Sequence, residues 1–157
     1  MQWYRKAAEQ GFAVSQVHIG NMYRDGRGVS QDYAKAMQWF RKAAEQGFAP
    51  AENNIGNLYE DGHGVPQDYV EAARWYRKAA ERSEPVAFAS LGNLYATGHG
   101  VPLDNVQAHM WFSMAASNGF AEAVSIRDEI ATKMTPAQII AAQTLAREWK
   151  PKTATAP

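Results

Sequence analysis

Two short stretches decide how this chain folds. Residues 55–65 read IGNLYEDGHGV, and residues 75–81 read WYRKAAE. In and around each stretch, small and apolar residues recur at spacings of three and four, which is typical of one face of a helix. The glycines of Gly-x-Gly-Val then interrupt the first pattern, because they tolerate a left-handed turn. The stretches therefore predict two helices, over about 49–60 and 69–81, joined by a glycine turn.

The same pattern recurs along the chain with a period of 36 residues. Tryptophan shows the register most clearly, and small residues and tyrosine follow it. The columns are Trp3/Trp39/Trp75/Trp111, Gly20-Asn21/Gly56-Asn57/Gly92-Asn93, Tyr23/Tyr59/Tyr95 and Ala43-Ala44/Ala79-Ala80/Ala115-Ala116. The small columns indicate closely approaching helices, and the Trp and Tyr columns are expected to fill the gaps between copies. One helix pair cannot bury its own apolar face, so the copies must stack. We predict an all-α solenoid of helix–turn–helix repeats.

The second helix of each copy has recognisable start and stop signals. Aspartate stands at the N-cap position, and glycine is expected at the left-handed position after the helix. The caps are Asp32, Asp68 and Asp104, and the following residues are Gly47, Ser83 and Gly119. Asp68 with Glu71 matches a capping box, as does Thr135 with Gln138.

These columns resemble the Sel-one-like repeat (SLR) family, a 36-residue relative of the tetratricopeptide repeat. The resemblance rests on Leu/Ile-Gly-Asn-Leu/Met-Tyr, Gly-x-Gly-Val, Asp-Tyr and Trp-Tyr/Phe-Arg-Lys-Ala-Ala-Glu, and it covers about residues 1–120. It implies a right-handed α/α superhelix whose first helices line a concave groove. Similar proteins are adaptors and scaffolds in complex assembly, in bacterial envelope processes and in host–microbe contact. The resemblance thus implies a bacterial adaptor that binds a protein or peptide.

The period divides the chain into parts of a single repeat domain over 1–150. We expect a lone second helix at 1–12, full repeats at 13–48, 49–84 and 85–120, capping helices at 121–150, and a flexible tail at 151–157. The capping assignment follows from the loss of the repeat signature at Arg127, Asp128 and Ala131, and from a new helix start at Thr135. The last helix should run over about 136–150.

The chain begins inside a repeat, which leaves an open face at Trp3 and Tyr4. This face marks a missing unit, a dimer contact or both. No signal peptide stands at the start of this chain, and its compartment stays open because a periplasmic or secreted longer protein is compatible with a start inside a repeat.

Positions on the first helices that avoid the packing columns should face the groove. By analogy with the tetratricopeptide repeat they are Val14, Val17, Asn21, Arg24, Asn53, Asn57, Glu60, Ala89, Asn93 and Ala96. The asparagine column is the most informative, since an amide can pair with a peptide backbone of any sequence. The alternative is that these amides form hydrogen bonds within the scaffold.

Composition and motifs exclude several other classes of function. Sixteen basic residues balance sixteen acidic ones, so charge gives no reason to expect nucleic acid or an anionic membrane as partner. There are no cysteines, and no apolar run is long enough to span a membrane. His63 and His99 occupy equivalent turns a repeat apart, too distant for one metal ion, and we expect them to be solvent-exposed. We predict no metal and no cofactor.

The leading hypothesis is a non-enzymatic protein–protein interaction module. An enzyme is the first alternative, since cysteine-rich relatives have been linked to β-lactam binding or slow hydrolysis. This chain lacks their disulfides, and no nucleophile–base pair stands out in its sequence. A structural piece of a longer scaffold is the second alternative, and it is favoured by the start inside a repeat.

Overall fold

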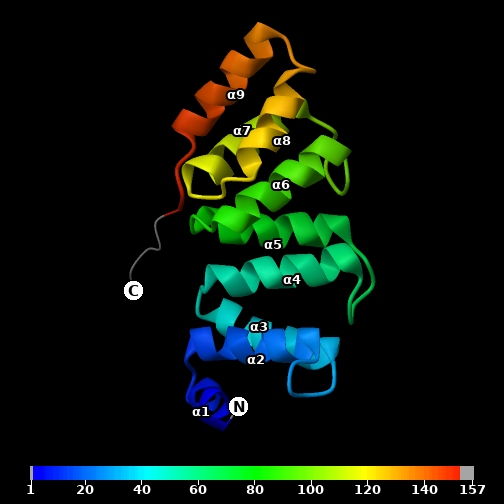
Figure 1. Ribbon diagram of the computed structural model, residues 1–157, viewed down its shortest axis with the longest axis vertical. Coiled ribbons are helices and arrows are strands. Elements are labelled where there is room, and N and C mark those ends of the chain that lie inside the picture. The colour runs from blue at the N-terminus through cyan, green and yellow to red at the C-terminus, as the bar shows by residue number, and fades with distance from the viewer. Residues whose placement is uncertain (1, 153–157) are drawn as a thin grey trace. The chain divides into compact units, whose positions relative to one another are not determined.

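The computed structural model describes residues 2–152, with side chains from Tyr4 onward. Within that range the regular structure is entirely α-helical (Figure 1). The nine helices described are α1 (Gln2–Glu9), α2 (Ala13–Asp25), α3 (Tyr33–Glu45), α4 (Ala49–Asp61), α5 (Tyr69–Glu81), α6 (Pro85–Thr97), α7 (Asn105–Ser117), α8 (Ala123–Ala131) and α9 (Pro136–Glu148). The predicted all-α fold of helix–turn–helix pairs is confirmed. The helices predicted at 49–60, 69–81 and 136–150 are present as α4, α5 and α9.

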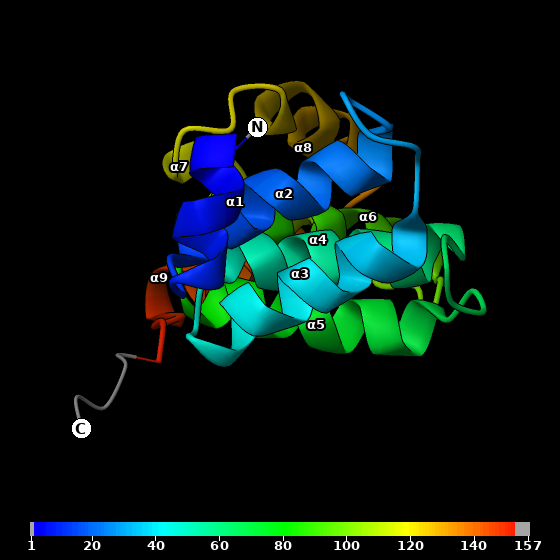
Figure 2. The same cartoon turned by 90° about the horizontal axis from the view of Figure 1, so that it is seen from below.

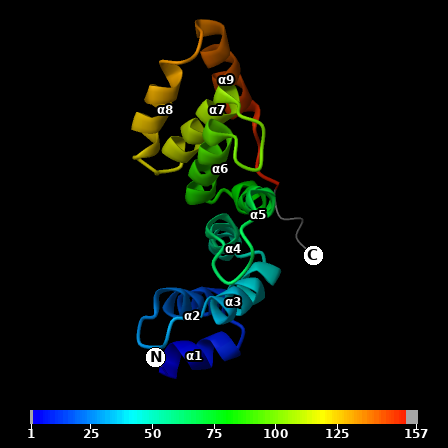
Figure 3. The ribbon, with the colours of Figure 1, turned by 90° about the vertical axis from the view of Figure 1, so that its right-hand side faces the viewer.

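The chain forms two compact units, Met1–Trp75 and Tyr76–Pro157, and the division falls inside α5. In unit 1, α2 packs against α1 and α3, and α3 packs against α4, as Figure 2 shows for the first three helices. In unit 2, α7 is the central helix, because it packs against α6, α8 and α9 (Figure 3).

In each unit a repeat glycine allows a very close approach of two helices. A Cβ atom on Gly92 would lie 2.8 Å from the ring of Phe112, and a Cβ on Gly20 would collide with the ring of Phe40. Both phenylalanines are completely buried. The prediction that the small columns mark close approach is therefore confirmed at these two positions.

The expectation that the Trp and Tyr columns are the aromatics that fill the gaps between copies is only partly met. The completely buried aromatic is the residue that follows the tryptophan, namely Phe40, Tyr76 and Phe112. Trp39 and Trp75 are half-buried, and of the tryptophans with described side chains only Trp111 belongs to the buried core. One helical step of 100° separates the two columns, and periodicity alone could not decide which of them points inward.

The helix caps largely follow the sequence signals. The aspartate carboxylates at 32, 68 and 104 each accept a hydrogen bond from a backbone N–H of the first turn. Thr135 and Gln138 form a reciprocal capping box at the start of α9. The capping box predicted for Glu71 is wrong, because the Asp68 N–H donates to the Tyr59 carbonyl and the Glu71 carboxylate pairs with Arg74 instead.

The ends of the second helices also agree with the sequence signals. Gly47, Ser83 and Gly119 all adopt positive φ, with values of 72°, 62° and 97°. Ser83 is the one residue other than glycine for which the described backbone enters this left-handed region. Its Cβ therefore carries a steric cost that the two glycines avoid.

A hydrogen bond joins the second helix of one copy to the first helix of the next, and it repeats three times. Arg5 Nη2 donates to Tyr23 Oη at 3.2 Å, Arg41 Nη2 to Tyr59 Oη at 3.3 Å, and Arg77 Nη2 to Tyr95 Oη at 2.8 Å. Each pair spans eighteen residues, half of the repeat. We call this set the Arg–Tyr ladder.

The end of α9 is anchored in unit 2 by aromatic contacts. The Trp149 ring meets Phe88 edge-on at a centroid distance of 5.2 Å and Trp111 at 6.0 Å. Ala142, in the middle of α9, is completely buried. Beyond the helix, Lys152 Nζ pairs with the Glu81 carboxylate at 2.8 Å, and residues 153–157 of the predicted tail lie outside the described residues.

Candidate functional site

The C-terminal half of α2 and the turn after it form a polar pocket in unit 1. Its volume is about 440 Å³. The pocket is lined by His18, Asn21, Met22, Arg24, Asp25 and Arg27. Two of the residues predicted for the groove, Asn21 and Arg24, are thus brought together in its wall.

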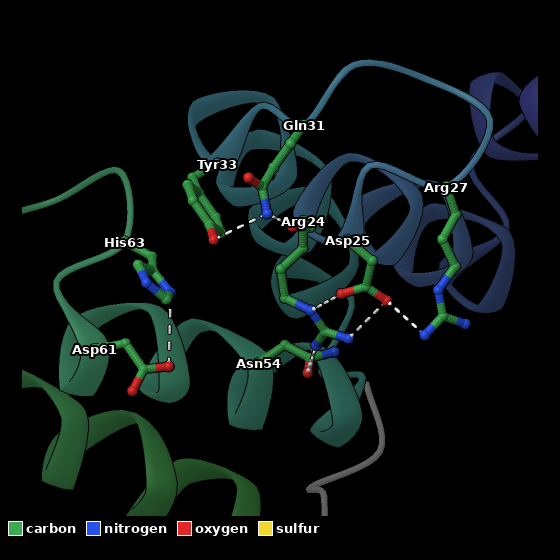
Figure 4. Close-up of polar contacts among 8 residues, drawn as sticks. All are labelled: Arg24, Asp25, Arg27, Gln31, Tyr33, Asn54, Asp61 and His63. Carbon is green, nitrogen blue, oxygen red and sulfur yellow. Dashed lines mark hydrogen bonds and ion pairs between the residues drawn. The ribbon is translucent and has the colours of Figure 1, made fainter.

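Arginine and aspartate form a charged network along one side of this pocket (Figure 4). Arg24 Nε lies 2.7 Å from Asp25 Oδ1, and Arg27 Nη2 lies 3.2 Å from Asp25 Oδ2. The hydrogen bond from Arg24 lowers the pKa of Asp25, although burial opposes the shift. Arg24 Nη1 also donates to Asn54 Oδ1 on α4 at 3.2 Å. The pocket therefore carries two guanidinium groups and one carboxylate, held to the neighbouring first helix.

The amide of Asn21 is incompletely satisfied. Its Oδ1 atom is buried and has no hydrogen-bond donor among the described residues. An unpaired buried carbonyl oxygen costs about 1–3 kcal/mol relative to a paired one. At this position the alternative of a scaffold hydrogen bond to the side-chain oxygen is not realised.

The ten predicted groove residues divide into surface and core positions. Val14, on α2, is 66% exposed, and Asn93 is also exposed. The half-exposed ones are Asn21, Arg24, Asn57, Glu60 and Ala96. Val17, Asn53 and Ala89 are buried, and Val17 belongs to the core cluster of unit 1 together with Phe40 and Ile55. These three buried side chains are not part of the exposed surface.

One of the two residues predicted for an open N-terminal face contacts a neighbouring helix. The Tyr4 ring is 47% exposed and stacks on the His18 imidazole at a centroid distance of 4.1 Å. The side chain of Trp3, the other residue predicted for this face, lies outside the described residues. Phe12, which precedes α2, is 60% exposed and adds apolar area at the same end of the helix.

The turn histidine of the second copy is exposed but not isolated. The His63 ring stacks on Tyr33 at a centroid distance of 4.4 Å, and its Nδ1 lies 3.7 Å from Asp61 Oδ2 (Figure 4). The neighbouring Gly64 is required by this contact, since a Cβ there would lie 2.7 Å from Tyr33 Cβ. Among the residues described, no group of three or more His, Asp or Glu side chains is placed to hold a metal ion.

Sequence reasoning missed a second polar pocket, in unit 2. It is lined by side chains from α7, α8 and α9, among them His109 and Ser113. His109 had no obvious partner in the sequence, because the residues that complete this pocket come from the two helices outside the repeat pattern. The signal that could have found it is the replacement of repeat-column residues at 113, 127, 128 and 131.

Comparison with known proteins places the chain in a family. The Sel1 repeat model matches residues 1–12, 13–48, 49–84 and 88–120. No similar sequence is found among curated proteins. None of the helices described has the length and apolar character that a membrane crossing requires.

Two solved structures show the same fold. One is a protective antigen of uropathogenic Escherichia coli strains that displays an SLR fold, with 42% identity and a TM-score of 0.74 over 78% of this chain. Another is a Sel1 repeat protein from Oxalobacter formigenes, with 37% identity and a TM-score of 0.73 over 83% of this chain. The chain spans 26% and 52% of the lengths of these two proteins. It belongs to the Sel1 repeat family.

Proposed function

We propose that the chain is a non-enzymatic protein–protein interaction module, and that the polar face of α2 and α4 in unit 1 binds an extended segment of a partner protein. The observation that carries this proposal is the buried Asn21 Oδ1, which lacks a donor and lies in the wall of a pocket of about 440 Å³. A rotation of the amide that turns Oδ1 towards the pocket would let it accept a hydrogen bond from a backbone N–H of the partner.

The charges of this face favour a neutral segment, because Glu60 of α4 balances the surplus positive charge of the pocket on α2. Arg24 and Arg27 together outweigh Asp25 by one positive charge. The bond from Arg24 to Asn54 holds the guanidinium in place, so little side-chain freedom is lost when a partner binds. Asn57 and Glu60 extend the same polar column along α4.

Apolar area lies at the other end of α2. Val14 and Phe12 are exposed side chains that a mildly apolar part of the partner segment would cover. On α6 of unit 2, Asn93 and Ala96 stand at the same repeat positions as Asn57 and Glu60 and would form a separate surface of this kind.

Peptide selection tests the proposal. Peptides chosen from a random phage-displayed library against the full chain should lose at least about fivefold in affinity when Asn21 is replaced by alanine, which corresponds to roughly one hydrogen bond. Gln38→Ala removes an exposed amide from α3, the second helix of the same repeat, and should leave the affinity for the peptides unchanged. Circular dichroism would check that both variants keep the parent's helical content.

Equal affinity of the parent and Asn21→Ala for every selected peptide would rule out this face as the binding site. Turnover of nitrocefin above the buffer rate would contradict the non-enzymatic part of the proposal.

A further inference from the structure

The pocket of unit 2 lies where the repeat pattern would place another rung of the Arg–Tyr ladder. One period after Arg77 stands Ser113, and one period after Tyr95 stands Ala131. Neither side chain can form the bond, and both line a cavity of about 590 Å³. Two large side chains have thus been replaced by two small ones, and the space remains open in the folded chain.

Two packing columns change character at the same place. Arg127 stands one period after Leu91, and Asp128 stands one period after Gly92. Both residues line the cavity, and Arg127 Nη2 lies 2.7 Å from Asp128 Oδ1. A charged pair therefore occupies positions that are buried and carry Leu91 and Gly92 in the preceding copy.

Arg147 on α9 also lines the cavity. Its Nη2 lies 3.3 Å from the Thr144 hydroxyl, which helps to hold the guanidinium. No carboxylate of residues 2–152 forms an ion pair with it. Since Arg127 is already paired with Asp128, Arg147 leaves the cavity with one uncompensated positive charge.

The remaining walls combine a polar and an apolar side. His109 is 4% exposed, and burial, reinforced by the charge of Arg127, lowers its pKa and so favours the neutral ring. Ile139 and Ala146 of α9 add aliphatic groups to the lining. A cavity of several hundred Å³ whose walls combine charged, polar and aliphatic groups is large enough for a small ligand.

The geometry argues against a nucleophilic role for Ser113. Its Oγ donates to the His109 carbonyl at 2.8 Å and lies 3.4 Å from His109 Nδ1. A general base that activates a hydroxyl has to accept its proton at about 2.6–3.2 Å. The single proton of Ser113 is instead directed at the backbone of its own helix.

We propose that this cavity binds a monoanionic carboxylate with a short apolar stem, and that the Arg147 guanidinium holds the carboxylate. A planar guanidinium can bind a carboxylate through two parallel hydrogen bonds. A second negative charge on the ligand would meet the Asp128 carboxylate, so dianions are disfavoured. The carboxylate belongs to a free small acid or to the C-terminus of a peptide, which share this chemistry. This site is separate from the face of α2 and does not depend on the function proposed for it.

Calorimetric titration of the full chain with matched acids and amides tests the proposal. The probes are N-acetyl-leucine and its primary amide, and an N-acetylated tetrapeptide ending in leucine as the free acid and as the amide. Each acid should bind at least about tenfold more tightly than its amide, because the amide carries no charge. Tighter binding of the tetrapeptide acid would identify a chain terminus as the ligand, and tighter binding of N-acetyl-leucine would identify a small acid.

Three variants locate the binding site. Arg147→Gln should weaken acid binding at least about tenfold and remove the preference for acid over amide. Lys150→Gln removes an exposed positive charge close in sequence that does not line the cavity, and should change acid affinity less than twofold. The double variant Ser113→Arg/Ala131→Tyr restores the ladder residues, fills the cavity and should abolish binding.

Circular dichroism would establish whether each variant is folded. If the double variant does not fold, the result for Arg147→Gln alone tests whether the cavity binds the carboxylate. The proposal is overturned if acids and amides bind equally, if Arg147→Gln binds acids as the parent does, or if no acid binds at up to about 10 mM.

Discussion

The α2–α3 pair of unit 1 and the α6–α7 pair of unit 2 are two copies of the same repeat with different surfaces. In both, a glycine of the first helix lies against a completely buried phenylalanine of the second, Gly20 on Phe40 and Gly92 on Phe112. The polar features differ. In unit 1 a pocket lies along α2, the first helix of its pair, whereas in unit 2 a pocket is lined by α7, the second helix of its pair. The residues that pack one copy are therefore separate from the residues that could recognise a ligand.

Breaking the shared core should have the largest effect. Gly92→Ala places a methyl group within 2.8 Å of the Phe112 ring, and Gly20→Ala collides with Phe40 in the same way. Each phenylalanine is completely buried and has little room to move. We expect each variant to lose about 1–3 kcal/mol of unfolding free energy, measured by urea denaturation. Asn93→Ala, at an exposed position next to Gly92, should stay within about 0.5 kcal/mol of the parent.

The response to acid should distinguish the two copies next. Burial, then the charge of Arg127, lowers the pKa of His109 below 6.5, and Asp128 opposes the shift. The unfolded chain therefore binds the proton more tightly, and stability falls as the pH drops from about 6.5 through the folded-state value. Arg147 also lines this cavity and adds positive charge.

Met37 occupies the position of His109 in the first copy. The variant His109→Met should lack this acid-dependent loss, so its stability relative to the parent should rise as the pH is lowered from about 7.5 to 5. Thermal melts across this range would measure the difference. A constant difference would show that His109 does not couple folding to pH.

A smaller effect on stability is expected at Ser83 of unit 2, which stands where the other copies have glycine. Ser83 has a φ of 62°, and Gly47 occupies the equivalent position in the preceding copy. Relieving the left-handed strain gains about 1–2 kcal/mol, and the added freedom of the unfolded chain removes up to about 1 kcal/mol of this. Ser83→Gly should therefore be more stable by about 0.5–1 kcal/mol in chemical denaturation, and a less stable variant would contradict the assignment of strain.

The smallest effect concerns the turn of the third copy. In the first two copies a glutamine amide bonds a backbone carbonyl at the end of the first helix, Gln31 to Arg24 and Gln67 to Glu60. Leu103 takes this place in unit 2 and is 64% exposed. Leu103→Gln should stabilise the chain by about 0.5 kcal/mol through the regained hydrogen bond. Gln67→Leu should lower the free energy of unfolding by a similar amount. Urea denaturation of both variants checks the prediction, which requires stability changes of opposite sign.

The helical repeat could be predicted almost completely because it depends on local signals. Apolar spacing, the aspartate caps and the glycine turns each act over a few residues, and α4 and α5 appear where they place them. The repeat also doubles or triples each signal, which removes the ambiguity of any one copy. Among the predicted helix caps, the reciprocal bond of Glu71 failed, because a backbone hydrogen bond from Asp68 to Tyr59 takes its place.

The candidate sites were harder to predict because they depend on which helix face meets which neighbour. Val17 was predicted to face the groove, yet its side chain belongs to the buried core cluster that contains Phe40. The cavity at His109 depends on Arg147, which belongs to a helix with no counterpart in the repeat. No periodicity connects those two residues, so only the folded arrangement brings them together.

The Arg–Tyr ladder has a consequence for how such chains grow. Each rung takes its arginine from one copy and its tyrosine from the following one, as Arg41 and Tyr59 do. If a 36-residue segment of the gene is duplicated in tandem, the new copy arrives with a complementary half for each of its seams. Lengthening by recombination therefore needs no newly evolved contact. At Ser113 and Ala131 both halves of the rung are absent, so a copy added there would lack this bond. The cavity that these two small side chains line is available for another function.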